Sequence, residues 1–255
     1  MGYRRPFVAY VEMAMLQWMA LRSFAVTLVA NQAVAPLIGL AVWTTALSGR
    51  AHVSAYYVAL LFVQLLTVSY ENHTFSNRIY NGELADDLLR PHPVFLRPLG
   101  DNLALRFWHV LLGLPLLVAI RILVPVGTSA SDVALAMPSV LLAGALRFLF
   151  TYLLALSALW MERAHSVVGF GDTLIFLLGG GAAPAELMPH PLQALALASP
   201  FRAMYGLPAE ISAGWLGPPA ILAGYALQLG WLALLVLLNL LVWRAGIERY
   251  TAVGG

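Results

Sequence analysis

The sequence predicts an all-α integral membrane protein with six transmembrane helices, in a single transmembrane domain that covers residues 1–255. Hydrophobic residues make up 61% of the chain, charged residues make up 10%, and the mean hydropathy of +0.81 lies well above that of soluble domains. The apolar residues also occur in runs long enough for a helix to cross the roughly 30 Å hydrocarbon core of a bilayer. Charged residues gather between these runs.

Runs that hold at most one charged residue define the predicted spans. They lie at about 23–47, 53–71, 107–126, 133–160, 166–182 and 219–243. Residues 1–22 mix arginines with large apolar residues and are expected to form an amphipathic helix at the membrane surface. A secretory signal peptide is the alternative, but it is disfavoured because a full apolar span follows at once.

Prolines interrupt the chain between the fifth and sixth spans. Residues 184–214 contain Pro184, Pro189 and Pro191, and the apolar stretch 192–198 is too short to cross a membrane. We therefore expect an outer re-entrant helical hairpin, or a surface helix, over residues 184–214.

Residues 77–93, here called the charged segment, separate the second and third spans. An Asn-Gly turn signal precedes a short helix that is rich in acidic residues at its start and is stopped by Pro91. Leu84 and Leu88 would form an apolar edge, and Asp86 could pair with Arg90 four residues later. A small charged helix with one apolar edge is typical of a docking element. The candidate docking residues are Gly82, Glu83, Leu84, Asp86, Asp87, Leu88, Leu89, Arg90 and Pro91.

The distribution of arginine predicts the orientation of the chain. All 14 basic residues are arginine, and ten of them fall in the N-terminal segment, the second and fourth connections and the tail, against three on the opposite face. By the positive-inside rule, both termini and the charged segment are expected in the cytoplasm. The net charge of +2 is too small and too scattered to favour nucleic-acid binding.

Signatures of enzymatic chemistry are absent from the sequence. There is no phosphate-binding Gly-x-x-x-x-Gly-Lys-Ser/Thr loop, no cysteine, and no pair of histidines at metal-binding spacing among the six histidines. We therefore predict that the chain is not itself an ATPase, has no catalytic residues and binds no metal.

Four polar residues within apolar runs are candidates for a substrate path or a subunit interface: Arg147, Asp172, Asn31 and Gln32. Arg147 and Asp172 would differ by about 10 Å in depth if each is counted along its helix. Three roles for Arg147 stay open: a direct pair with Asp172, a side chain that faces substrate or a partner chain, and a structural arginine reached by water.

The order of these elements resembles the membrane subunit of an ABC-2 type ATP-binding-cassette exporter from bacteria. The segment from Arg78 to Pro91 resembles the "I-x-x-G-x-L-x-x-x-L-L-R-P" motif of one permease branch of that family, and residues 184–192 with Ser199-Pro200-Phe201 resemble its outer proline-rich motif. The resemblance covers nearly the whole chain. No motif known in the family matches Arg147.

The resemblance implies a permease in the bacterial inner membrane, with the helix of the charged segment docked on a separate ATPase subunit. ATP and magnesium would bind to that partner, and Glu162 and Arg163 would make a second, smaller contact. It also implies a second permease chain, identical or sister, with the substrate path between the two. A secondary transporter and a non-catalytic membrane scaffold are the alternative functions.

Overall fold

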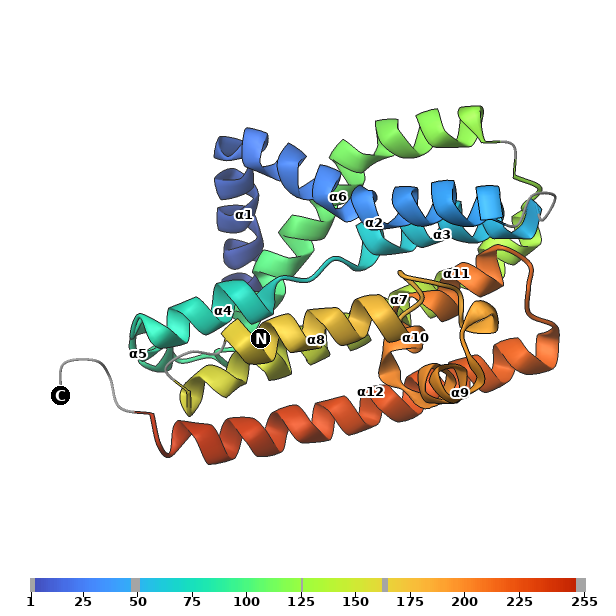
Figure 1. Ribbon diagram of the computed structural model, residues 1–255. Helices are drawn as coiled ribbons and strands as arrows, with labels where there is room; N and C mark the ends of the chain where they lie inside the picture. The colour runs from blue at the N-terminus through green and yellow to red at the C-terminus, as the bar shows by residue number, and fades with distance from the viewer. Residues whose placement is uncertain (1–2, 47–50, 125, 162–164, 251–255) are drawn as a thin grey trace.

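The computed structural model describes residues 3–46, 51–124, 126–161 and 165–250, and within them every regular element is a helix (Figure 1). The long helices are α2 (Arg22–Ala46), α3 (Ala51–Thr67), α6 (Leu96–Leu123), α7 (Ala130–Leu156) and α12 (Pro218–Ile247). The shorter helices are α1 (Arg4–Ala20), α4 (Glu71–Tyr80), α5 (Leu84–Leu88), α8 (His165–Leu178), α9 (His190–Ala198), α10 (Pro200–Met204) and α11 (Gly206–Ser212), with 3-10 turns at Ser157–Leu159 and Ala185–Leu187.

Five helical segments are long and apolar enough to cross a bilayer: Ser23–Ala46, His52–Tyr80, Leu96–Leu123, Ala130–Leu159 and Pro218–Ile247. The prediction of an all-helical chain is thereby confirmed for the described residues, with five helices able to span a membrane where six were predicted. The fifth predicted span, 166–182, coincides with α8, whose 14 residues extend only about 21 Å. The helix ends at Leu178 because three glycines follow, and Gly180 has φ +95°, which a right-handed helix cannot contain.

The second predicted span is broken at its C-terminal end. Residues 68–70 are not helical, so the predicted span 53–71 runs past the end of α3. The freed carbonyl of Val68 accepts hydrogen bonds from Asn102 Nδ2 at 3.2 Å and Arg106 Nε at 3.1 Å. Arg106 also donates through Nη2 to the carbonyl of Gly144 at 2.6 Å. Side chains of α6 therefore bind the break and tie it to α7.

Helix α6 begins at Leu96, well before the predicted start of the third span at about 107. The prediction placed the start after the last charged residue of the connection. In the structure Arg97 and Arg106 lie inside the helix, because each finds polar partners on neighbouring elements. Tertiary contacts thus extend the helix beyond what local hydropathy indicates.

Residues 184–214 form more than a hairpin. Helices α10 and α11 pack against α7, and α11 also packs against α3. Met204, Leu207 and Ile211 are almost fully buried there, and an ion pair between Arg202 and Glu210 is buried beside them. Only α9 lies outside this layer, with exposed leucines along it. Residues 200–212, for which the sequence predicted no separate helix, therefore belong to the core of the protein.

The two ends of the bundle differ in character. Figure 1 places α5, the first turn of α1 and the last turn of α12 toward one end, and the end of α2 and the start of α12 toward the other. At the first end, Tyr10 of α1 contacts His92 of the charged segment. At the opposite end, Trp43 of α2 donates through Nε1 to the carbonyl of Ala182 at 3.0 Å. Helix α1 runs across the direction of α2 and α3 (Figure 1).

Candidate functional site

A buried ion-pair cluster fixes the charged segment. The Asp87 side chain is 1% exposed and receives Arg78 Nη2 of α4 at 2.8 Å and Arg97 Nη1 of α6 at 3.1 Å. Arg78 Nη1 also contacts Glu83 Oε2 at 2.6 Å. Gly82, with φ +79°, makes the left-handed turn between α4 and α5 that brings Asp87 back toward Arg78. One carboxylate therefore links α4, α5 and α6.

Two details of the predicted docking element are wrong. Leu84 is 0% exposed, because it packs within the chain against Phe75 and Tyr152. The predicted pair of Asp86 with Arg90 is not formed: Arg90 Nη1 instead donates to Tyr10 Oη at 3.0 Å. Helix α5 has five residues, so tertiary packing decides which side chains it exposes.

The exposed surface of the charged segment is apolar at its tip. Leu88 is 39% exposed, Leu89 is 86% exposed and Tyr80 is 61% exposed. Glu83, Asp86, Arg90 and Pro91 are also exposed around them. These side chains are available to a partner without any rearrangement of the core.

A second polar cluster lies where α3 gives way to α4. Glu71 is 3% exposed and accepts hydrogen bonds from Asn102 Nδ2 at 2.8 Å and Thr151 Oγ1 at 2.7 Å. Burial of an acidic residue at this position is supported by donors from both α6 and α7. The N-terminal end of α4 is thus fixed by α6 and α7, as its C-terminal end is fixed by the ion pairs of Asp87.

The four polar residues singled out in the sequence meet at one cavity. It encloses about 230 Å³, and we call it the polar cavity. Its lining consists of Asn31, Gln32, Ala35, Gln64, Ser69, Tyr70, Arg147, Asp172, Ile175, Phe176 and Tyr205. Side chains from α2, α3, α7 and α8 therefore converge on a site that no single helix displays.

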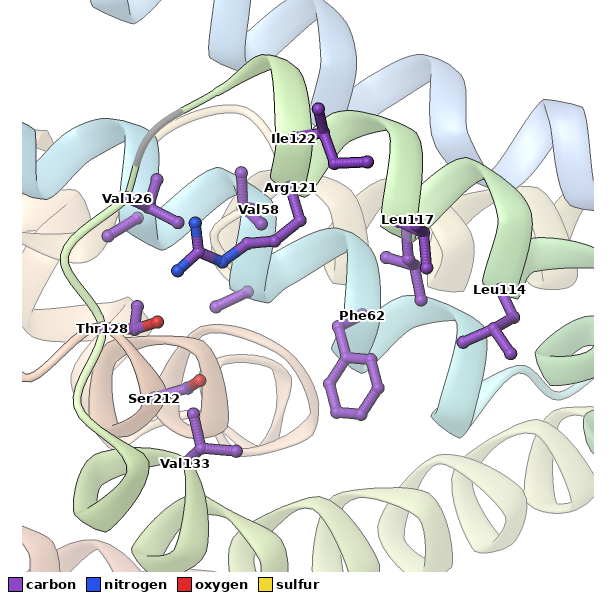
Figure 2. Close-up of a pocket in the computed structure, with 13 residues that line it drawn as sticks. Val58, Phe62, Leu114, Leu117, Arg121, Ile122, Val126, Thr128, Val133 and Ser212 are labelled. Atoms are coloured by element: carbon purple, nitrogen blue, oxygen red, sulfur yellow. The ribbon is translucent and has the colours of Figure 1, made fainter.

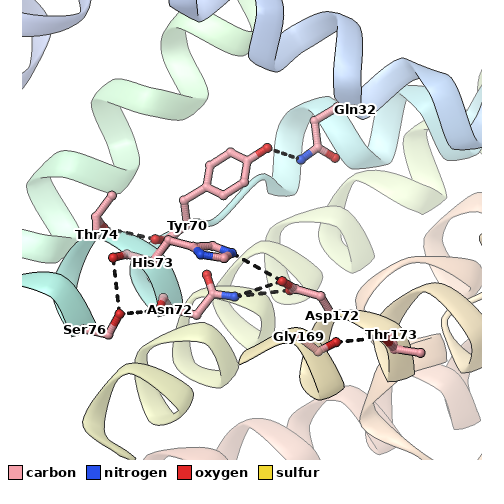
Figure 3. Close-up of polar contacts among 9 residues, drawn as sticks. All are labelled: Gln32, Tyr70, Asn72, His73, Thr74, Ser76, Gly169, Asp172 and Thr173. Carbon is pink, nitrogen blue, oxygen red and sulfur yellow. Dashed lines mark hydrogen bonds and ion pairs between the residues drawn. The ribbon is translucent and has the colours of Figure 1, made fainter. Parts of the chain in front are cut away.

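Side chains of α4 contact Asp172, one of the residues that line the polar cavity (Figure 3). Asn72 Nδ2 donates to Asp172 Oδ1 at 3.2 Å, and His73 Nε2 lies 3.4 Å from Asp172 Oδ2. Gln32 Nε2 donates to Tyr70 Oη at 2.7 Å. Asp172 thus turns toward α4, and Gln32 connects α2 to the residue just before α4.

Arg147 enters the polar cavity without a carboxylate partner. It is 6% exposed, and no ion pair or side-chain hydrogen bond of its guanidinium occurs among the described residues. The guanidinium lies over the ring of Tyr205, 4.4 Å from its centroid. Such a contact contributes up to about 2 kcal/mol when desolvated. A central arginine costs about 2.5–3.5 kcal/mol on insertion scales, so the ring offsets only part of the cost. A direct pair with Asp172 is not formed.

A larger cavity of about 390 Å³ lies between α3 and α6 and is almost wholly apolar (Figure 2). Arg121 near the end of α6 is exposed, as expected for an arginine that reaches out of the hydrocarbon. Figure 2 shows its side chain pointing toward the connection that carries Val126 and Thr128. This cavity offers space to hydrocarbon but few polar contacts.

Glu162 and Arg163 lie outside the described residues. Within the described residues, no group of three or more His, Asp or Glu side chains could hold a metal ion. Sequence reasoning missed Tyr70 and Tyr205 as cavity residues, because tyrosines near span ends are ordinarily assigned to the membrane interface.

Comparison with protein families decides the assignment. Residues 16–254 match the family described as ABC-2 family transporter protein. The chain belongs to this ABC-2 family. Comparison with curated proteins and with solved structures found no match.

Membership settles several predictions. An ABC-2 permease is a membrane subunit without a nucleotide-binding domain, so the chain is not an ATPase. Permeases of this family typically pair with ATPase subunits. The chain is thus the multi-pass membrane component of a transporter, and its features can be interpreted as those of an ABC-2 permease.

Proposed function

We propose that this ABC-2 permease is the membrane subunit of an exporter, driven by a separate ATPase subunit that docks on the charged segment, residues 77–93. The partner binds ATP and magnesium, and the permease binds no cofactor of its own. Two permease chains, identical or sister, enclose the substrate path. The charged segment and both termini face the cytoplasm of a bacterial cell, and the chain resides in the inner membrane.

The observation that carries this proposal is the exposed apolar tip of the charged segment. Leu89 and Tyr80 are large, exposed side chains in a segment rich in charge; Tyr80 is the last residue of the apolar segment His52–Tyr80, and Leu89 lies beyond it. The ion pairs of Asp87 hold the tip in place from within the chain. A preformed tip of this kind loses little conformational freedom when a partner covers it.

Helix α4 offers a direct route from the docking surface to the polar cavity. Its last turn carries Arg78, which pairs with Asp87 of α5. Its first turn carries Asn72 and His73, which contact Asp172 at the cavity. Ten residues of helix span about 15 Å, so a shift of α5 would move α4 as one stiff element and, with it, the two side chains that contact Asp172.

Helix α8, with the glycine-rich residues after it, completes a six-span arrangement in this proposal. The helix is short, but apolar helices that pack inside a protein assembly need not match the full bilayer thickness. Its exposed side chains Phe170, Phe176 and Leu177 would contact lipid or the second permease chain. The arrangement fits an ABC-2 exporter better than a secondary transporter or a scaffold, because it combines a docking surface with a cavity.

The docking proposal is tested by Leu89→Asp in the purified permease, titrated with its ATPase partner subunit. Burial of one leucine contributes about 1.5–3 kcal/mol, so we expect affinity to fall about tenfold to hundredfold. ATP-driven transport in reconstituted vesicles should fall with it. The matched control is Leu123→Asp, which changes a leucine of similar exposure at the end of α6.

The control variant should bind the ATPase as the wild-type chain does. Undiminished affinity and transport in the Leu89→Asp variant would show that the ATPase docks elsewhere. Equal losses in both variants would point to a general effect of an added charge and would likewise reject the docking surface.

A further inference from the structure

The polar cavity contains the guanidinium of Arg147, a positive charge that no carboxylate of the described residues pairs with. Arg147 is more than nine-tenths buried, and its Nε and Nη1 atoms are buried without a hydrogen-bond partner among the described residues. A guanidinium carries five N–H donors in a planar fork that matches carboxylate and phosphate. Tyr205 contacts the face of this fork, which leaves the donors at its edge free.

The acidic group of the same cavity is engaged elsewhere. Both oxygens of Asp172 accept from Asn72 Nδ2, at 3.2 and 3.4 Å, and one oxygen lies 3.4 Å from His73 Nε2 (Figure 3). Asp172 is not within ion-pair distance of Arg147 among the described residues. Glu71, the other acidic residue nearby, is occupied by Asn102 and Thr151. The donors of Arg147 are therefore not neutralised by contact with either acid.

The shape and the rim of the polar cavity limit what could enter it. Its volume of about 230 Å³ is smaller than the 300–1,000 Å³ typical of sites for drug-sized ligands, so it suits a headgroup more than a whole amphiphile. Asn31 and Phe176 at its rim are exposed, on α2 and α8. Beyond them, Ile38 and Leu177 expose apolar surface on the same two helices. A headgroup in the cavity would leave its hydrocarbon chain beside α2 and α8.

We propose that the polar cavity binds the anionic headgroup, phosphate or carboxylate, of an amphiphilic substrate, with Arg147 as the residue that contacts the anion. Gln32, Gln64 and Asn31 supply further polar groups around it. The inference rests on the proposed function, because it assigns a substrate class to the cavity of the transport subunit. It concerns binding by this chain alone, so it can fail or succeed independently of ATPase docking.

Calorimetric titration of the purified permease in a neutral maltoside detergent tests the proposal. The probes are dodecyl phosphate, dodecyltrimethylammonium and inorganic phosphate. We expect dodecyl phosphate to bind and dodecyltrimethylammonium not to bind. The Arg147→Gln variant loses a charge-assisted contact to the headgroup, so its affinity for dodecyl phosphate should be about tenfold or more lower than that of the wild type. If inorganic phosphate competes with dodecyl phosphate for the cavity, the anion alone suffices for binding. If inorganic phosphate does not compete, the hydrocarbon chain is also needed.

Two further variants make the result decisive. Arg121→Gln is the matched control, because this exposed arginine borders the apolar cavity of Figure 2 and not the polar cavity; it should bind dodecyl phosphate as wild type does. Ala35→Phe fills the polar cavity and leaves Arg147 in place, so it should also weaken binding and decides the question if Arg147→Gln fails to fold.

The proposal is overturned if wild type does not prefer the phosphate to the ammonium probe. It is also overturned if Arg121→Gln abolishes binding of dodecyl phosphate while Arg147→Gln and Ala35→Phe bind it as the wild type does. Normal ATPase docking with no binding of the phosphate probe would reject the anion site and keep the proposed function. Binding of the phosphate probe without ATPase docking would keep the anion site and reject the proposed docking function.

Discussion

Asp87 and Asp86 provide a sharp test of how the charged segment is held. Asp87→Asn removes a charge that pairs with Arg78 and Arg97, whereas Asp86→Asn changes an exposed neighbour on the same helix. Breaking a buried ion pair on one side costs about 3–5 kcal/mol when the opposite charge is left buried without compensation. Here Arg78 keeps its contact with Glu83, and both arginine side chains are partly exposed. Asparagine keeps one oxygen that can accept a hydrogen bond, so we expect a loss near the lower limit, about 3 kcal/mol for Asp87→Asn.

The loss corresponds to roughly a hundredfold change in the folding equilibrium, since about 1.4 kcal/mol is a factor of ten. Asp86→Asn should change stability by less than about 0.5 kcal/mol, as surface substitutions usually do. Denaturant unfolding of the purified chain in detergent micelles, followed by tryptophan fluorescence, measures both. Equal stability of the two variants would refute the reasoning, because it would mean that the carboxylate of Asp87 stabilises nothing despite its two arginine contacts.

Two further substitutions probe the packing around the same region. Leu84→Ala should destabilise the chain by about 2–5 kcal/mol, whereas Leu89→Ala should change stability by less than about 0.5 kcal/mol, because only Leu84 is buried within the chain; the same unfolding measurement compares them. Gly144→Ala should lower the melting temperature, since its Cβ would lie 2.7 Å from Arg106 Nη1, whereas Gly230→Ala, with no atom within 4 Å, should raise stability by up to about 1 kcal/mol through helix propensity. A stabilising Gly144→Ala would contradict the tight approach of Arg106.

Hydropathy predicts helices well where a helix is mostly exposed within the chain, as α2 and α12 are. Helix α2 begins one residue before the predicted span 23–47 and covers all of its described residues, and α12 contains the predicted span 219–243 entirely. It fails where charges are satisfied by distant partners. Arg97 and Arg106 lie inside α6 because Asp87 and the carbonyl of Val68 accept their hydrogen bonds, and these partners are not visible in local sequence.

The polar cavity shows a different limit of prediction. Each of Asn31, Gln32, Arg147 and Asp172 could be recognised alone as a polar residue in an apolar run. Their meeting depends on how α2, α7 and α8 pack, which residue spacing along one helix does not encode. The estimate of depth along each helix separated Arg147 from Asp172, yet both line one cavity.

At the charged segment, the prediction placed an exposed side chain where the structure has a buried one. Helical spacing grouped Leu84 with Leu88 as one exposed edge, but Leu84 is buried in a hydrophobic cluster with Phe75 of α4 and Tyr152 of α7. A helix of five residues has too little structure of its own to determine which face is exposed. The exposed edge is consequently shifted toward Leu88 and Leu89.

If the ATPase docks on the charged segment and the polar cavity binds an anion, as proposed, α4 makes the two binding events parts of one equilibrium. Arg78 at one end of this helix pairs with Asp87 of the charged segment, while Asn72 and His73 at the other end contact the cavity residue Asp172. A ligand changes the position of α4 only if it binds one position more tightly than another. Linkage then requires that the ATPase change the affinity of the cavity by the same factor as the cavity ligand changes the affinity for the ATPase. Equal factors measured in the two directions would therefore be required of any coupling through α4, however small the movement.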